Sequence, residues 1–359
     1  MSETADPPRA GALDLAGIRR AVDARLAGFL DAKARLAAEE GFPAEFTGVL
    51  RDLVLAGGKR IRPELCVVGW YAAAGGRDTE PVLAVAASLE MFHAFALVHD
   101  DVMDRSTTRR GQPSAHEALA ARHPSHPDAA RLGASAAILL GDLALVWSDE
   151  MLHTAGLSQD RFGAAAAVVH TMRTELMYGQ YLDLFATGQP GTDIDAALRI
   201  ARLKSAKYTV ERPLHLGAAL AGADAELFSA LSAFALPLGE AFQLRDDLLG
   251  VFGDPAVTGK PADDLREGKH TALVALALHR ATGSDRELLE NLLRGAEPGP
   301  GFVARIRDLL ESTGARDGIE QLIAARHRQA QLALTAAGLP ETASTALRAI
   351  ASTLTERTS

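Results

Sequence analysis

Apolar residues in this chain recur mainly every three or four positions, the spacing that lines up side chains on one face of an α-helix. We find no stretch in which apolar and polar residues alternate over the length of a strand. Clusters of Gly, Pro and polar residues interrupt the helical pattern and predict loops. The clearest helical segments are Val82–Val98, Phe162–Phe185, Ala196–Leu220 and Leu227–Leu249, and the expected loops are Gly57–Pro63, Ser106–His116, Arg122–Gly133, Thr187–Asp193, Gly253–His270 and Ala296–Gly301.

None of these loops is long enough to separate two domains. We therefore expect an all-α fold, a single-domain bundle of roughly ten or more helices around a central cavity. The bundle would occupy residues 16–359, after a disordered segment at residues 1–15. Apolar residues make up 48% of the chain, which is ample for such a core.

The charge balance is acidic. The chain has 37 Lys and Arg against 46 Asp and Glu, a net charge of −9. A general nucleic-acid surface needs an excess of basic residues, so we expect no nucleic-acid partner. A single cysteine, Cys66, cannot form an internal disulfide, which is typical of a protein in a reducing compartment.

The N-terminal segment and the longest apolar stretch indicate where the protein is located. Met1–Arg19 carries charges and two prolines before any apolar run, unlike a signal peptide. The longest apolar stretch, about Ala134–Trp147, is interrupted by Asp142 and is shorter than the roughly 20 residues needed to cross a bilayer. We expect no transmembrane segment and a cytoplasmic location.

Two groups of aspartates, each followed by basic residues, suggest the chemistry. The first is His-Asp-Asp-Val-Met-Asp at 99–104, before Arg109-Arg110-Gly111; the second is Phe-Gln-Leu-Arg-Asp-Asp at 242–247, before Lys260, Asp263-Asp264 and Lys269. Clustered carboxylates repel one another unless cations lie between them. Mg²⁺ typically binds one or two carboxylates plus substrate phosphates, and Arg and Lys hold the remaining phosphate oxygens. The pattern indicates a site for a diphosphate ester.

Both groups fall at the ends of predicted helices. Residues four apart share a helix face, so Asp100 and Asp104 should project together, with Asp101 about 100° round the axis. Asp246 and Asp247 close the apolar helix that begins near Leu227. Two such helices facing each other would make a cavity with a metal-lined mouth and an apolar floor.

In order and spacing, these motifs resemble those of trans-isoprenyl diphosphate synthases of the polyprenyl synthetase family. The resemblance covers about Leu53 to Thr271. It implies the isoprenoid synthase fold, a homodimer, and condensation of isopentenyl diphosphate with dimethylallyl, geranyl or farnesyl diphosphate. The matching motifs are Gly57-Gly58-Lys59-Arg60-Ile61-Arg62-Pro63, Glu90-Met91-Phe92-His93, both aspartate motifs, Gly179-Gln180-Tyr181-Leu182-Asp183-Leu184, Lys204-Ser205-Ala206, Gly259-Lys260-Pro261 and Asp264-Leu265-Arg266-Glu267-Gly268-Lys269.

The resemblance assigns roles to individual residues. The cofactor it implies is Mg²⁺, with Mn²⁺ as a substitute. The Mg²⁺ ligands are Asp100, Asp104 and Asp246, assisted directly or through water by Asp101, Asp247 and Asp264. The allylic diphosphate is held by Arg109, Lys204 and Lys269, with Lys260 bridging to it or to a metal, and Gln243 lies beside the nascent cation. Isopentenyl diphosphate is bound without metal by Lys59, Arg62, His93 and Arg110.

Other interpretations stay open for several of these residues. Gly57-Gly58 is also typical of a helix C-cap, and His93 of a buried core histidine. Gly179, Gln180 and Asp183 have a structural interpretation, so we do not count them among the principal site residues. The chain departs from the family at Gly250, where a third Asp is usual, and at Ser205, where Thr is commoner but the hydroxyl is kept.

The residues upstream of the first aspartate motif suggest the product. Phe95 lies five positions before Asp100, about 7.5 Å along a helix, and Ala96 lies four before. Family members with one aromatic at the fifth position, a small residue at the fourth and no insertion in the motif resemble geranylgeranyl diphosphate synthases. That product is therefore expected, and Phe95→Ala should lengthen it. The alternative is that Phe95 only packs in the core. The alternative functions are a terpene cyclase, a non-catalytic subunit of a heteromeric synthase and a plain helical scaffold.

Overall fold

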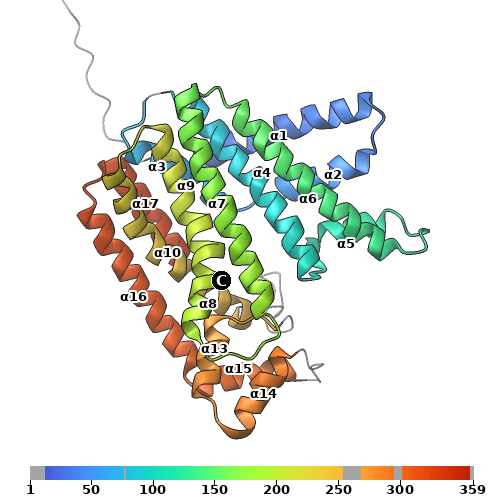
Figure 1. Ribbon diagram of the computed structural model, residues 1–359, viewed down its shortest axis with the longest axis vertical. Helices are drawn as coiled ribbons and strands as arrows, with labels where there is room; N and C mark the ends of the chain where they lie inside the picture. The colour runs from blue at the N-terminus through green and yellow to red at the C-terminus, as the bar shows by residue number, and fades with distance from the viewer. Residues whose placement is uncertain (1–12, 77, 254–267, 295–300, 356–359) are drawn as a thin grey trace, which may run out of the picture.

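The computed structural model describes residues 13–76, 78–253, 268–294 and 301–355, which form a bundle of helices (Figure 1). The predicted all-α class is confirmed, as is the expectation of ten or more helices. The helices are α1 Leu15–Glu39, α2 Ala44–Leu55, α3 Ile61–Ala72, α4 Glu80–Met103, α5 Ala115–Ala121, α6 Ala129–His153, α7 Gln159–Ala186, α8 Ile194–Ala201, η1 Arg202–Glu211, α9 Arg212–Leu220, α10 Ala225–Phe252, α13 Ala272–Arg280, α14 Gly283–Leu293, α15 Phe302–Ser312, α16 Ala315–Ala336 and α17 Glu341–Thr355.

Local sequence explains where several helices begin. The side chains of Asp14, Ser158 and Asp224 each accept a hydrogen bond from a backbone N–H in the first turn of α1, α7 and α10. Such caps satisfy donors that lack a partner within the helix and contribute about 1 kcal/mol each. Helix α1 therefore begins at Leu15, one residue before the predicted start of the domain.

The two helices that carry the aspartate motifs run through the centre of the bundle. Helix α4 is buried along most of its length and packs against α6, α3 and α1, while α10 packs against η1 and α16. Each motif lies at the C-terminal end of its helix. The core thus fixes both motifs to rigid elements, and it presents them to one cavity.

The segment predicted as a single helix over Ala196–Leu220 consists of α8, η1 and α9, and η1 is a π-helix. A π-helix adds residues to each turn, and it often lies at a functional site. Gly239 of α10 allows the close packing, because a Cβ at that position would overlap the backbone of Ala206. The wide turns of η1 carry Lys204 and Ser205 to the cavity.

The expected loop Ser106–His116 contains a two-stranded antiparallel hairpin, β1 Thr108–Arg109 with β2 Gln112–Pro113. These strands of two residues are too short to show an alternating pattern. The loop ends early because α5 begins at Ala115, and α6 begins inside the expected loop Arg122–Gly133.

Among the residues that the structure describes, three helices are long and apolar enough to cross a membrane: α4, α6 and α10. All three are longer than Ala134–Trp147, the apolar stretch from which no transmembrane segment is expected. The most apolar window of α4 is 72% buried inside the protein and that of α10 is 50% buried, whereas that of α6 is only 28% buried. The exposed face of α6 therefore needs its own explanation.

Candidate active site

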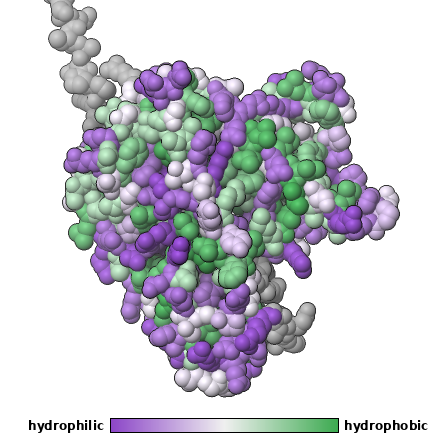
Figure 2. All heavy atoms as spheres, viewed as in Figure 1, coloured by the Kyte–Doolittle hydropathy of each residue, from purple (hydrophilic) through white to green (hydrophobic). Residues whose placement is uncertain are grey.

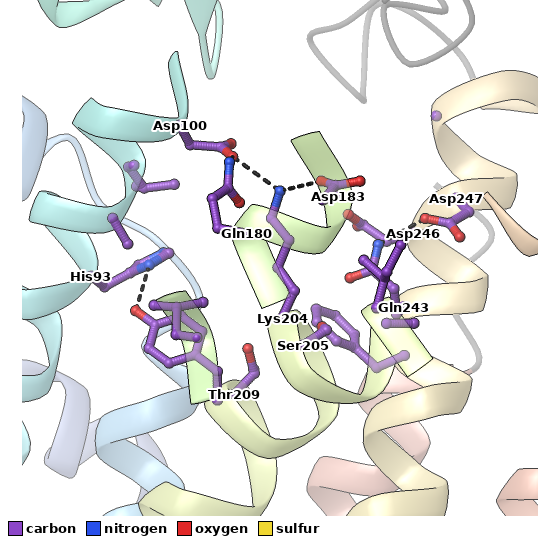
Figure 3. Close-up of a pocket in the computed structure, with 18 of the residues that line it drawn as sticks. His93, Asp100, Gln180, Asp183, Lys204, Ser205, Thr209, Gln243, Asp246 and Asp247 are labelled. Carbon is purple, nitrogen blue, oxygen red and sulfur yellow. Dashed lines mark hydrogen bonds and ion pairs between the residues drawn. The ribbon is translucent and has the colours of Figure 1, made fainter. Parts of the chain in front are cut away.

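A cavity of about 1000 Å³ lies between α4, α7, η1 and α10 (Figure 3). Residues predicted from both aspartate motifs and from both diphosphate sites line it together. They are Lys59, Arg62, His93, Phe95, Ala96, Asp100, Arg109, Arg110, Lys204, Ser205, Gln243, Asp246, Asp247 and Lys269. The predicted Lys260 and Asp264 lie outside the described residues.

Asp100 is the centre of a polar network on the first side of the cavity. Its carboxylate accepts hydrogen bonds from Lys204 Nζ at 3.1 Å, Gln180 Nε2 at 3.1 Å and an Arg109 N–H at 3.3 Å. Burial tends to raise the pKa of Asp100, but Lys204, Lys269 and Arg109 outweigh it and hold that pKa well below its usual value. Asp100 is therefore an anionic oxygen donor at the pH of the cell.

The other two aspartates of the first motif each face a basic residue. Asp101 is buried and accepts hydrogen bonds from Arg109 Nε at 2.9 and 3.2 Å. Asp104 lies 2.8 Å from Lys269 Nζ. Burial lowers the pKa of Arg109, but the hydrogen bond with Asp101 raises it by more. The pKa of Arg109 therefore lies above its usual value, and the guanidinium keeps its charge. The contacts of Asp101 thus orient Arg109, which itself lines the cavity.

The second motif faces the first across Lys204. Figure 3 shows Asp246 and Asp247 on α10, opposite Asp100, with Lys204 between them. Gln243 donates a hydrogen bond from Nε2 to Asp247 Oδ1 at 2.7 Å, which holds its amide at the cavity wall. Gly250, one turn further along α10, also lines the cavity, where it offers no carboxylate.

The donor set fits Mg²⁺ when a diphosphate is present. Within the described ranges, no three His, Cys, Asp or Glu side chains lie close enough to hold a metal by themselves. Lysines partner the carboxylates instead, since Lys204 also lies 2.7 Å from Asp183. Mg²⁺ prefers oxygen ligands and usually takes only one or two from protein carboxylates, with phosphates and water supplying the rest. Carboxylates on two facing helices match that requirement.

A second group of cations lies around the loop before α3 and lines the same cavity. Arg110, in the hairpin turn, donates a hydrogen bond to the Gly57 carbonyl. Gly58 has φ +154°, and a Cβ there would lie 3.0 Å from the Arg110 guanidinium, so glycine permits this approach. The glycine pair thus shapes a cationic pocket, beyond any role in ending α2.

His93 and Arg62 meet on Tyr208 of η1. The Tyr208 hydroxyl lies 3.2 Å from His93 Nδ1, and the Arg62 guanidinium stacks 4.2 Å above the Tyr208 ring. Arg62 also donates to Thr209 Oγ1 at 2.8 Å. Burial and then the nearby arginines lower the pKa of His93, so the ring is neutral, and burial raises the pKa of Tyr208 to about 12.

The sequence reasoning missed some of these residues. Tyr208 and Thr209 belong to the π-helix, which no hydrophobic pattern distinguishes from an α-helix. Gln180 and Asp183 were set aside as structural, yet they contact Asp100 and Lys204 directly. Their position in a motif that matched the family was the available signal.

Aromatic rings form the wall beneath Asp100. Phe95 packs between Phe92 and His99, with ring centroids 5.3 and 4.7 Å away. His99 is held by a hydrogen bond between Nε2 and the Ile138 carbonyl at 3.0 Å. Phe95 and Ala96 both line the cavity, as expected of residues that limit its depth.

Comparison with known proteins identifies the family. The polyprenyl synthetase family model matches residues 43–310. A geranylfarnesyl diphosphate synthase of Aeropyrum pernix is 33% identical over 282 residues, which cover 77% of this chain and 83% of that protein. A geranylgeranyl diphosphate synthase of Mycobacterium tuberculosis is 38% identical over 220 residues, covering 60% and 58%.

Solved structures agree with the sequence relatives. The crystal structure of geranylgeranyl pyrophosphate synthase from Corynebacterium glutamicum, complexed with isoprenyl diphosphate and magnesium, covers 96% of this chain and 100% of its own at 42% identity and a TM-score of 0.92. The resemblance inferred from the motifs is confirmed. The chain belongs to the polyprenyl synthetase family and is a trans-prenyltransferase.

Proposed function

We propose that this prenyltransferase uses Mg²⁺ to condense isopentenyl diphosphate with dimethylallyl, geranyl and farnesyl diphosphate, and that it stops at geranylgeranyl diphosphate. The observation that carries the proposal is the single cavity in which two facing aspartate motifs adjoin a separate cationic pocket. Two anionic sites beside one apolar wall match two diphosphate substrates that share a hydrocarbon chain. A terpene cyclase has no use for the second cationic pocket, and a non-catalytic subunit has no use for either.

The first step would break the bond between the allylic carbon and the diphosphate oxygen, and the electron pair leaves with pyrophosphate. Asp100, Asp104 and Asp246 would hold Mg²⁺, and the bound metal would supply positive charge to the leaving oxygens. Arg109, Lys204 and Lys269 add fixed positive charge that stabilises developing negative charge more than the ground state. The Gln243 amide would direct its carbonyl dipole toward the allylic cation.

The second step would form the new carbon–carbon bond. The double bond of isopentenyl diphosphate would attack the allylic cation, and the adduct would then lose a proton to an oxygen of the released pyrophosphate, which regenerates an alkene. Lys59, Arg62 and Arg110 would hold the second diphosphate, while neutral His93 contributes a hydrogen bond. The apolar wall from α4 keeps water from capturing the cation.

The two pockets can be tested separately. Asp100→Asn should lower kcat strongly because it removes charge used in ionisation, with about 100-fold as the expected scale for one electrostatic group. Arg62→Gln should mainly raise KM for isopentenyl diphosphate and leave KM for farnesyl diphosphate within about twofold. If Arg62→Gln raised KM for the allylic substrate instead, the assignment of the two pockets would be wrong.

We also propose that two copies of the chain associate through α6 and α7. Large apolar side chains on these helices are exposed, and Figure 2 shows apolar residues gathered over this face. A patch of this kind on a soluble protein marks an interaction surface. The exposed side chains are Ile138, Leu139, Val146, Met177, Tyr178, Tyr181, Leu184 and Phe185.

Sedimentation equilibrium should give the mass of two chains for the wild type. Leu139→Glu combined with Tyr178→Glu should give the mass of one, because the charges would be buried unpaired. Leu332→Glu is the matched control, since Leu332 is at least as exposed as Leu139 and Tyr178 but lies on α16. A one-chain mass for the wild type would overturn the dimer.

A cytoplasmic location stays a prediction, supported by the buried free thiol of Cys66.

A further inference from the structure

Arg60 lies between Lys59 and Arg62, two cations of the proposed isopentenyl diphosphate pocket, and it borders the same cavity, yet its side chain is buried and bonded to protein groups. It donates three hydrogen bonds: Nε to Asp23 Oδ1 at 2.8 Å, one NH₂ group to Glu90 Oε2 at 2.8 Å, and the other to the Val54 carbonyl at 2.7 Å. The side chain is only 4% exposed. These bonds join the loop to α1, α2 and α4.

The backbone at Arg60 indicates that the position is held by its contacts. Its φ of +49° places this residue in the left-handed region, directly before α3. Side chains with a Cβ disfavour that conformation, so it persists only where surrounding contacts impose it. The first turn of α3 carries Arg62. The anchored Arg60 therefore fixes where the cations on either side of it can lie.

Glu90 gives this anchor an electrostatic consequence. It is on α4, one turn before His93, it is buried, and it lines the cavity beside Arg110. A carboxylate at this place repels a diphosphate unless a cation neutralises it. The buried ion pair with Arg60, at 2.8 Å, supplies such a cation, and the side chains of both partners are at most 5% exposed.

We propose that Arg60 is a positioning residue for isopentenyl diphosphate: it neutralises Glu90 and locks the loop that presents Lys59 and Arg62. Arg60 acts through Glu90 and the loop, since its guanidinium hydrogen-bonds to three protein groups rather than to the diphosphate. Replacing it exposes the diphosphate to the charge of Glu90 and releases the loop, so the loss should appear in KM for isopentenyl diphosphate. This inference rests on the proposed location of that substrate.

The test compares Arg60→Met, Glu90→Gln and the double variant. Arg60→Met should raise KM for isopentenyl diphosphate about tenfold or more, because it leaves a buried charge unpaired. KM for farnesyl diphosphate and kcat at saturation should stay within about twofold. Adding Glu90→Gln to Arg60→Met should recover most of the lost affinity, because the repelling charge is then gone.

Arg19→Met is the matched control. Arg19 also joins α1 to a buried glutamate, Glu64 of α3, but neither residue lines the cavity. Arg19→Met should leave the KM values for isopentenyl diphosphate and farnesyl diphosphate unchanged. A double variant as impaired as Arg60→Met would show that the neutralisation of Glu90 plays no part in binding and would overturn the proposal. An equal change in both KM values on Arg60→Met would overturn it as well.

Two further variants keep the test decisive. If Arg60→Met does not fold, Arg60→Lys keeps the charge but lacks the three-way fork, and it should give an intermediate rise in KM for isopentenyl diphosphate; no rise would overturn the proposal. Arg62→Gln reports on the pocket itself. If Arg62→Gln leaves that KM unchanged, the pocket assignment fails, and the Arg60 proposal fails with it. If only Arg60→Met leaves it unchanged, the Arg60 proposal alone fails.

Discussion

Replacing Phe95 by Ala should lengthen the product by one isoprene unit. Phe95 lies on α4 five residues before Asp100, so its ring closes the cavity about 7.5 Å along the helix from the metal-binding end. Removing the ring leaves the methyl group of alanine beside Ala96. The next aromatic barrier along α4 is Phe92, which is fully buried.

The geometry sets the size of the effect. Phe92 and Phe95 are three residues apart, so the barrier retreats by about 4.5 Å. One isoprene unit extends a chain by four bonds, about 5 Å for carbon–carbon bonds of about 1.52 Å at tetrahedral angles. We therefore expect mainly a twenty-five-carbon product. The substitution should also cost about 3–5 kcal/mol of stability if the space stays empty.

The assay is sizing of dephosphorylated products made from labelled isopentenyl diphosphate and farnesyl diphosphate. Phe234→Ala is the control, since Phe234 is equally buried on α10 but does not line the cavity. It should lose stability without changing product length. If Phe95→Ala retains activity and still stops at twenty carbons, Phe95 is a core residue and the floor lies elsewhere.

The same structure makes three other predictions. Gly239→Ala should lower stability and activity together. Overpacking against Ala206 costs about 1–3 kcal/mol, more than the gain of about 1 kcal/mol in helix propensity. Denaturant unfolding would measure the stability, and steady-state kinetics the activity. His93→Gln should flatten the fall in stability between pH 7 and pH 5. Burial and then the nearby arginines hold the pKa of folded His93 well below its usual value. The unfolded chain therefore binds the extra proton, and acid favours unfolding by up to about 1.4 kcal/mol per pH unit. Chelation of Mg²⁺ should stop elongation and abolish the rise in Tm that inorganic pyrophosphate produces; a rise that persists in chelator would contradict metal-assisted binding.

The sequence predicted the helix class and most of the charged residues of the cavity wall because both depend on short-range patterns. Three- and four-residue spacing defines α4 and α10, and the aspartates at their ends need only a facing helix to converge. The π-helix could not be predicted in this way, because Arg202–Glu211 has the same apolar spacing as an α-helix. Its close packing against Gly239 of α10 is a contact between residues distant in sequence.

The network around Asp100 was also beyond the motifs alone. Gln180 and Asp183 lie on α7, and only the packed bundle brings them to Asp100 and Lys204. Glu90 was visible in a matching motif, but its link to Arg60 depends on the left-handed turn before α3. Residue types indicated the chemistry, whereas pairings across helices required the structure.

The most direct test of the central claim is elongation by the wild-type protein of labelled isopentenyl diphosphate with Mg²⁺ and, separately, dimethylallyl, geranyl and farnesyl diphosphate. Elongation of all three primers that stops at the twenty-carbon alcohol after dephosphorylation is the predicted result. Products that continue beyond twenty carbons would contradict the Phe95 floor. No elongation from any primer, by folded protein, would contradict the proposed reaction and point to the glycine at position 250.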